Sequence, residues 1–117
     1  LEGSGLVVAS GGGFMANYML GKRVACSSSE RGDGTWAEYM KVSAGNCIPL
    51  VKALDFEQGA SALVNPSTAL ALLERVEQGH HKSFINTAAG GALGKMIIKL
   101  AKKKNLTSNM SFKTTEG

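Results

Sequence analysis

The sequence predicts a mixed α/β protein, and three successive patterns along the chain support this fold class. Residues 1–54 contain short apolar runs between glycine turns, which is typical of β-structure. Residues 55–82 carry helix-capping residues and apolar positions at helical spacing. Residues 83–106 read as a strand, a tight glycine-rich turn and a helix. At 117 residues and 44% hydrophobic composition, the chain has room for one small globular domain or parts of two.

Four short strands are expected in the first half of the chain. Apolar or alternating side chains place them at residues 6–9, 22–26, 35–42 and 47–50, and Pro49 ends the last one. Short strands that glycine turns separate are typical of a piece of a β-barrel or β-sandwich.

Two helices are expected next. Asp55 can cap the first, and Gln58 stands three residues later as the reciprocal partner of a capping box. This helix is expected to run to residue 64. Asn65 is then a good N-cap and Pro66 suits the first position of a second helix. Gly79 is the expected C-cap of that second helix.

The glycine-rich turn at residues 88–94 follows a predicted strand at 83–87 and precedes a predicted helix at about 92–104. Its Ala88-x-x-Gly91-x-x-Gly94 spacing is a variant of G-x-G-x-x-G, in which small residues let a pyrophosphate approach the first N–H groups of a helix. The alternative is a purely structural turn, in which Gly94 lets the helix pack closely on the sheet. Taken alone, the turn supports both interpretations equally.

The net charge of +4 does not predict nucleic-acid binding. Much of it lies at the end of the last predicted helix, in Lys99 and Lys102–Lys104, with no aromatic residues between the lysines. A solvated helix face, with cations near the negative end of the helix dipole, explains them better. No apolar run reaches membrane-spanning length, so no membrane partner is expected.

Metal binding is not expected either. Cys26 and Cys47 match neither a CxxC pair nor a zinc spacing, and they are expected to be buried free thiols in a reducing compartment. His80 and His81 fall in a predicted linker without useful ligand spacing.

Several motifs in order resemble the medium-chain dehydrogenase/reductase superfamily. They are most similar to its zinc-independent members, the quinone oxidoreductases and enoyl thioester reductases. The resemblance spans residues 1 to about 106, and its motifs are EGSG at 2–5, GKRV at 21–24, GTWAEY at 34–39, NPSTA at 65–69 and AAGGALG at 88–94. Leu1 stands where zinc-dependent members carry a histidine before the acid, so the resemblance implies no zinc.

The resemblance implies a two-part architecture. Residues 1–54 would be the end of a GroES-like, substrate-holding β-barrel, and 55–82 a helical connection. Residues 83–106 would start a Rossmann NAD(P)-binding domain. Residues 107–117 are polar and aperiodic, and they are expected to form a flexible tail in place of the second strand of that domain.

The implied activity is hydride transfer from NADPH or NADH to an enone, quinone or enoyl thioester. Asn65 and Thr68 would lie at the nicotinamide as catalytic residues. The pyrophosphate would face the backbone of Ala89, Gly90, Gly91, Ala92, Leu93 and Gly94. A small-molecule substrate, a homodimer and a cytoplasmic location are expected.

The chain is expected to lack the opening strands of the barrel and every Rossmann element after the first helix. Because a single parallel strand cannot form a sheet, the chain alone is expected to be inactive. The alternative function is a non-enzymatic, oligomerising or partner-binding module, in which exposed strand edges recruit another chain.

Overall fold

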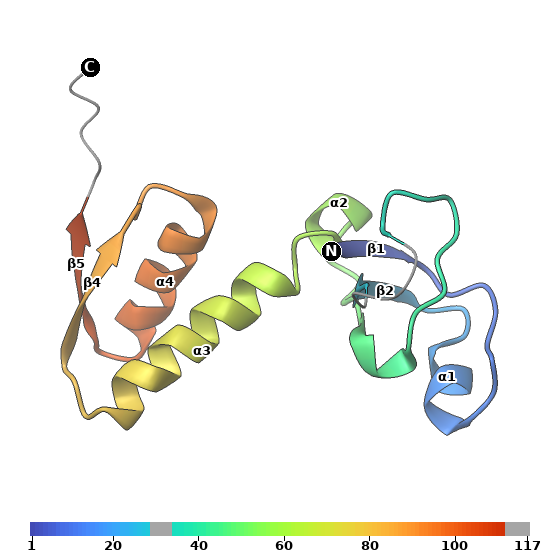
Figure 1. The fold of residues 1–117 in the computed structure, drawn as a ribbon, viewed down its shortest axis with the longest axis horizontal. Helices are drawn as coiled ribbons and strands as arrows, with labels where there is room; N and C mark the ends of the chain where they lie inside the picture. The colour runs from blue at the N-terminus through green and yellow to red at the C-terminus, as the bar shows by residue number, and fades with distance from the viewer. Residues whose placement is uncertain (29–33, 112–117) are drawn as a thin grey trace, which may run out of the picture. The chain divides into compact units, whose positions relative to one another are not determined.

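The chain folds into two compact units in the computed structural model, which describes residues 1–28 and 34–111. The first unit is Leu1–Val64 and the second is Asn65–Gly117 (Figure 1). Each contains a small sheet and helices, so the mixed α/β class is confirmed.

The first unit contains a three-stranded antiparallel sheet in the order β1-β2-β3. Ser4 of β1 and Ile48 of β3 flank Ala25 of the central strand on its two sides. The elements are β1 (Glu2–Leu6), α1 (Phe14–Met19), β2 (Arg23–Ser27), the 3-10 helix η1 (Ala44–Asn46), β3 (Cys47–Pro49) and α2 (Phe56–Gly59).

The predicted strands at 22–26 and 47–50 are confirmed by β2 and β3, but the strand at 6–9 is wrong. β1 lies earlier, at Glu2–Leu6, because this segment pairs along the whole of β2. Its glycines weaken local β-propensity, yet Gly3 fits because a Cβ there would lie 3.3 Å from the Thr35 side chain.

The predicted strand at 35–42 is also wrong. No strand of the described chain pairs with this segment, so its alternating pattern has no hydrogen-bonding partner. Trp36 is fully exposed and Tyr39 is 75% exposed, whereas Met40 and Val42 pack on the core formed by Met19, Val24, Cys26 and Cys47. The short helix α1 was not expected from the sequence, because Gly13 at its N-cap makes no side-chain hydrogen bond.

The capping box of α2 is confirmed. The backbone N–H of Gln58 donates to Asp55 Oδ1 at 2.7 Å, and the backbone N–H of Asp55 donates to Gln58 Oε1 at 3.2 Å. The helix nevertheless ends at Gly59, and four residues separate it from the next helix, so the extension to residue 64 is wrong.

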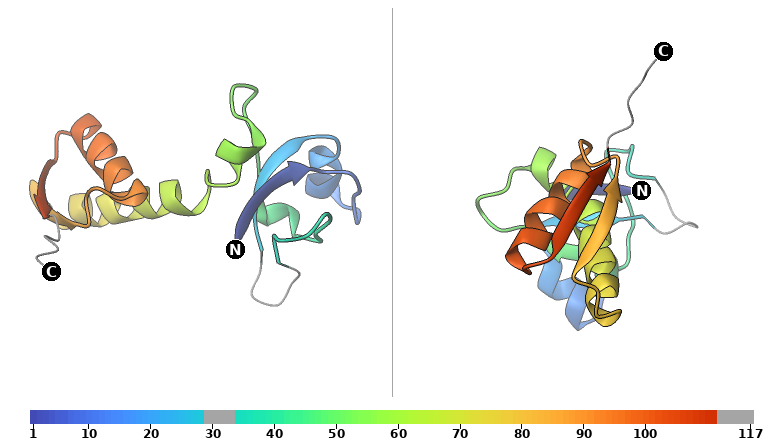
Figure 2. Two further views of the ribbon diagram at one scale, coloured as in Figure 1. Left: turned by 90° about the horizontal axis from the view of Figure 1, so that it is seen from above. Right: turned by 90° about the vertical axis from the view of Figure 1, so that its left-hand side faces the viewer.

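The second unit runs down α3 (Val64–Gln78), up β4 (Ser83–Thr87), down α4 (Ala92–Lys103) and up β5 (Thr107–Ser111), as Figure 1 shows. The predicted strand 83–87 is confirmed, and the predicted helix 92–104 is confirmed to within one residue. Both helices cover one face of the β4–β5 sheet (Figure 2). The core between them contains Ala69, Leu73, Ile97 and Ala101.

Asn65 is not the N-cap of α3, so that prediction is wrong. The helix begins at Val64, and Asn65 and Pro66 lie within its first turn. The carboxylate of Glu2 accepts hydrogen bonds from the backbone N–H groups of Leu63 at 3.3 Å and Val64 at 2.8 Å. Glu2, which is far from α3 in the sequence, therefore accepts hydrogen bonds at the start of the helix, the role that the sequence predicted for Asn65. Pro66 is tolerated because first-turn N–H groups need no intrahelical acceptor.

The C-terminus of α3 is a Schellman motif with a histidine in the left-handed position. The backbone N–H of His81 donates to the Val76 carbonyl at 3.1 Å, and that of His80 donates to Glu77 at 2.9 Å. Because α3 ends at Gln78, Gly79 is the C-cap as predicted, and the left-handed residue is the next one, His80, with φ 55.

The predicted flexible tail is wrong for residues 107–111, which form β5. Asn105 (φ 56) ends α4 in a second Schellman motif, in which the backbone N–H of Leu106 donates to the Ala101 carbonyl at 3.0 Å. Leu106 then packs on the core and directs the chain alongside β4. β5 pairs with β4 in parallel, with Ile85 opposite Asn109. Residues 112–117 of the predicted tail lie outside the described chain.

Replacing His80 with glycine is expected to stabilise the protein by about 1 kcal/mol, because glycine adopts positive φ without the steric cost that other residues pay. The free energy of unfolding is measured by urea denaturation followed by far-UV circular dichroism. His81→Gly is the matched control and is expected to destabilise, because His81 has no positive φ to relieve. Equal stability of the two variants would contradict this prediction.

Candidate functional site

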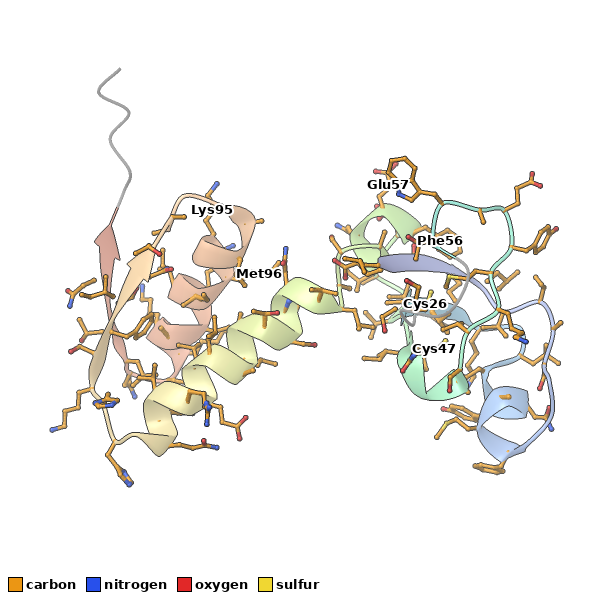
Figure 3. The ribbon with its side chains drawn as sticks, in the orientation of Figure 1. Cys26, Cys47, Phe56, Glu57, Lys95 and Met96 are labelled. Atoms are coloured by element: carbon orange, nitrogen blue, oxygen red, sulfur yellow. The ribbon has the colours of Figure 1, made fainter. Side chains whose placement is uncertain are left out.

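The turn between β4 and α4 consists of alanine and glycine residues, so backbone atoms make up most of it. Ala88 follows β4 in the left-handed region, with φ 53. The backbone N–H of Gly91 donates to the Ala88 carbonyl at 3.0 Å, and Gly91 is the N-cap of α4. Figure 3 labels Lys95 and Met96 at the start of this helix. The turn thus presents the beginning of α4 at the end of β4.

The N-terminus of α4 carries no side chain that would compete with an anion. Gly91 makes no side-chain capping hydrogen bond, and no acidic residue lies in the first turn. The first helical backbone bond is from Lys95 N–H to the Gly91 carbonyl at 3.0 Å. The N–H groups of residues 92–94 precede it and have no intrahelical acceptor, so they and the helix dipole favour a negative ligand.

The small residues of the turn have two different roles. Gly90, Gly91 and Ala92 are exposed, so their backbone is open to a ligand. Ala89 and Gly94 are buried against each other: a Cβ on Gly94 would lie 2.6 Å from the Ala89 Cα. The structural interpretation of Gly94 is therefore confirmed, since only glycine lets α4 approach the turn this closely.

Asn86 holds this packing together and was not predicted from the sequence. Its side chain is buried, and its Nδ2 donates to the Gly94 carbonyl at 3.2 Å. The sequence does carry a sign of this role: Asn86 is a single amide on the helix-facing side of a short strand, and a buried amide needs a hydrogen-bond partner. The bond fixes the first turn of α4 relative to β4.

Asn65 and Thr68 lie on a different element from the glycine-rich turn. They are three residues apart on α3, so they share one face of its first turns. Asn65 is half-buried and Thr68 is exposed. Because α3 runs opposite to β4, the start of α3 lies toward the end of the unit where β4 finishes (Figure 1).

An apolar groove leads away from the turn between α3 and β4. Ala88 and Leu93 line it at the turn, and Leu72, Val76 and Ile85 line it farther along. Gly94 and Ile97 of α4 also line the groove, and in the described part of the chain β4 pairs with a strand on one edge only. Apolar side chains of α3 and β4 therefore remain uncovered there.

The described residues contain no group of three or more His, Cys, Asp or Glu side chains that could hold a metal ion. They also contain no helix that is both long and apolar enough to cross a membrane.

Gly94→Ala is expected to destabilise the second unit by about 2 kcal/mol, because the added methyl group meets backbone atoms of Ala89 that cannot move aside. Urea unfolding measures the change. Gly91→Ser is the matched control and is expected to be near neutral, because its Cβ has room at 3.4 Å from the nearest atom and serine is a good N-cap. A neutral Gly94→Ala variant would show that the turn is looser than described.

Comparison with known proteins identifies relatives along most of the chain. No protein-family model matches it. Prostaglandin reductase-3 of Mus musculus is 34% identical over 102 residues, which cover 86% of this chain and 26% of the relative. The Bos taurus protein of the same name is 38% identical over 103 residues, which cover 87% of this chain and 26% of the relative. The chain thus spans about a quarter of these curated relatives.

Solved structures are also similar to most of the chain. A candidate NADPH:quinone reductase from Mesorhizobium loti has a TM-score of 0.83 and 40% identity, over 93% of this chain and 32% of the other. A mycobacterial protein solved with NADPH has a TM-score of 0.79 and 26% identity, and the match covers 98% of this chain and 35% of that protein. Together with the ordered motifs and the fold, these similarities show that the chain belongs to the medium-chain dehydrogenase/reductase superfamily.

Proposed function

We propose that the chain is the nucleotide-binding start of an NAD(P)H-dependent oxidoreductase. In this proposal β4, α4 and β5 are the first βαβ unit of a Rossmann domain, and the first unit is the end of a GroES-like β-barrel. The parallel pairing of β4 with β5 across α4 supports this assignment, because a glycine-rich turn inside such a unit is the usual dinucleotide site. The Rossmann part then extends at least to residue 111.

The single observation that carries the cofactor proposal is the uncapped N-terminus of α4. Its first-turn N–H groups, together with the exposed backbone of Gly90, Gly91 and Ala92, fit a pyrophosphate. Bound NADPH would supply the hydride, and the protein would supply its orientation. The mycobacterial structural relative was solved with NADPH, which agrees with this choice of cofactor.

NADP fits better than NAD because β5 contains no acidic residue. In NAD-binding units an Asp or Glu near the end of the second strand accepts hydrogen bonds from the ribose hydroxyls, and such an acid repels the 2′-phosphate of NADP. β5 has the sequence TSNMS. The residues that follow it, where the rest of this selectivity is expected, lie outside the described chain.

The proposed substrate is an enone, quinone or enoyl thioester that accepts the hydride at an electron-poor carbon. The names of the relatives, quinone and prostaglandin reductases, support this substrate class. Asn65 and Thr68 are proposed to lie beside the nicotinamide. A half-buried amide and a hydroxyl on one face of α3, toward the end of the unit where β4 finishes, suit that role. A homodimer and a cytoplasmic location belong to the same proposal.

A partner-binding module is the second candidate function. The observation that favours it is exposed apolar surface on the second unit: Ile85 is 74% exposed, Leu70 50% and Leu72 48%. Surface of this kind marks a place where another chain or segment packs. Size-exclusion chromatography with light scattering distinguishes the two candidates, because a stable dimer without nucleotide affinity favours the module.

NADPH binding to the 117-residue chain is expected to depend on charge at Gly91. Gly91→Asp should weaken binding about tenfold relative to Gly91→Asn, because a carboxylate beside the pyrophosphate costs about 1–4 kcal/mol of repulsion. Both residues are good N-caps, so both variants should fold equally well. The measurement is a titration followed by nicotinamide fluorescence.

If the two Gly91 variants bind NADPH with equal affinity, the pyrophosphate does not bind at the N-terminus of α4. The expectation that these 117 residues turn over no substrate alone stays a separate prediction. A quinone-dependent loss of NADPH absorbance, measured with the isolated chain, would contradict it.

A further inference from the structure

The two cysteines lie directly opposite each other on neighbouring strands of the first unit. In the antiparallel β2–β3 pair, Cys26 is the register partner of Cys47. Both are free thiols, and both are buried in one core cluster with Met19 and Val24. Figure 3 labels the pair. Because opposite residues of an antiparallel ladder point to the same face, the two sulfur atoms share one side of the sheet.

The hydrogen-bond pattern shows which kind of cross-strand pair this is. The backbone N–H of Leu50 donates to the Arg23 carbonyl at 2.8 Å, one step beyond the Val24–Pro49 pair. Hydrogen-bonded and non-hydrogen-bonded pairs alternate along an antiparallel ladder. Val24–Pro49 is therefore a non-hydrogen-bonded pair, which suits proline because it has no N–H. The Cys26–Cys47 pair lies two residues farther along the strands, so it is also a non-hydrogen-bonded pair.

The non-hydrogen-bonded position brings the two cysteines within bridging distance. Opposite Cα atoms at such a position are about 4.5 Å apart, and a disulfide accepts Cα separations from about 4.4 to 6.8 Å. The ionisation of the two thiols agrees with this closeness. Burial raises the pKa of both, and the neighbouring Cys26 raises that of Cys47 further.

The position of β3 in the sheet gives an oxidant a route to the buried thiols. β3 is three residues long and lies at the edge of the three-stranded sheet. Short edge strands open locally at low cost in free energy. Such opening exposes Cys47 while Cys26 stays on the central strand.

We propose that Cys26 and Cys47 are a thiol–disulfide pair that closes into an intramolecular disulfide when oxidised glutathione is the oxidant. One protein thiolate attacks the glutathione disulfide and expels a glutathione thiolate, which takes up a proton. The second protein thiolate then attacks the protein sulfur of the mixed disulfide and expels the other glutathione. Two protein thiols lose two electrons and two protons, and one oxidised glutathione becomes two reduced molecules.

The experiment incubates the full 117-residue chain with excess oxidised glutathione. The protein is then denatured, treated with N-ethylmaleimide and examined by intact mass and peptide mapping. The expected product is a monomer that has lost two hydrogen atoms, takes up no maleimide and yields a linked peptide containing Cys26 and Cys47. Its thermal midpoint should rise by about 10 °C and return after reduction with dithiothreitol.

Three results would overturn the proposal: stable glutathione adducts on either cysteine, a disulfide-linked dimer, or two thiols that still take up maleimide. Cys26→Ala and Cys47→Ala are matched controls, and both should show no rise in thermal midpoint with oxidised glutathione. If either variant fails to fold, the wild-type chain still provides a test. In a glutathione redox buffer, its disulfide should be at least tenfold more favoured in the native state than in urea, and equal stability would contradict the proposed geometry.

Discussion

The close packing of α4 against the end of β4 is the contact on which the second unit depends. Ala89 and Gly94 meet at a distance that leaves no room for a side chain on Gly94. The buried hydrogen bond from Asn86 to the Gly94 carbonyl fixes the same contact. With α4 held there, Ile97 and Ala101 face Ala69 and Leu73 of α3, and the chain returns through Leu106 to form β5. One glycine thus determines whether the helices can cover the sheet.

The same contact explains why backbone groups, and not side chains, form the proposed nucleotide site. Because Gly94 and Ala89 are used for packing, the small residues left exposed at the turn are Ala88, Gly90, Gly91 and Ala92. These residues bring almost no side-chain bulk to the N-terminus of α4, and no side chain caps it. A turn that satisfies a packing constraint therefore also leaves helix N–H groups accessible to an anion. The two interpretations of the glycine pattern describe different residues and do not compete.

The first unit depends on strand register more than on local propensity. Among the described strands of this sheet, β2 alone has a partner on both edges, and its central residues Val24, Ala25 and Cys26 are buried. Pairing with β2 draws the glycine-containing segment Glu2–Leu6 into a strand. The same register places Cys26 opposite Cys47 and Val24 opposite Pro49. The thiol pair proposed as a disulfide site is thus a consequence of sheet geometry that the spacing of the cysteines in sequence does not reveal.

The sequence by itself determined the elements whose signals are local. The Asp55–Gln58 capping box, the strands β2, β3 and β4, the helix α4 and the glycine-rich turn all follow from residues a few positions apart. Tertiary structure decided what depends on distant partners. The carboxylate of Glu2 accepts hydrogen bonds at the start of α3 in place of Asn65, and no strand of the described chain pairs with residues 35–42. Pairing with β4 makes a polar, aperiodic segment into β5. Backbone pairing across the chain outweighs weak local preference, because each hydrogen bond of a ladder needs a partner that the local sequence does not contain.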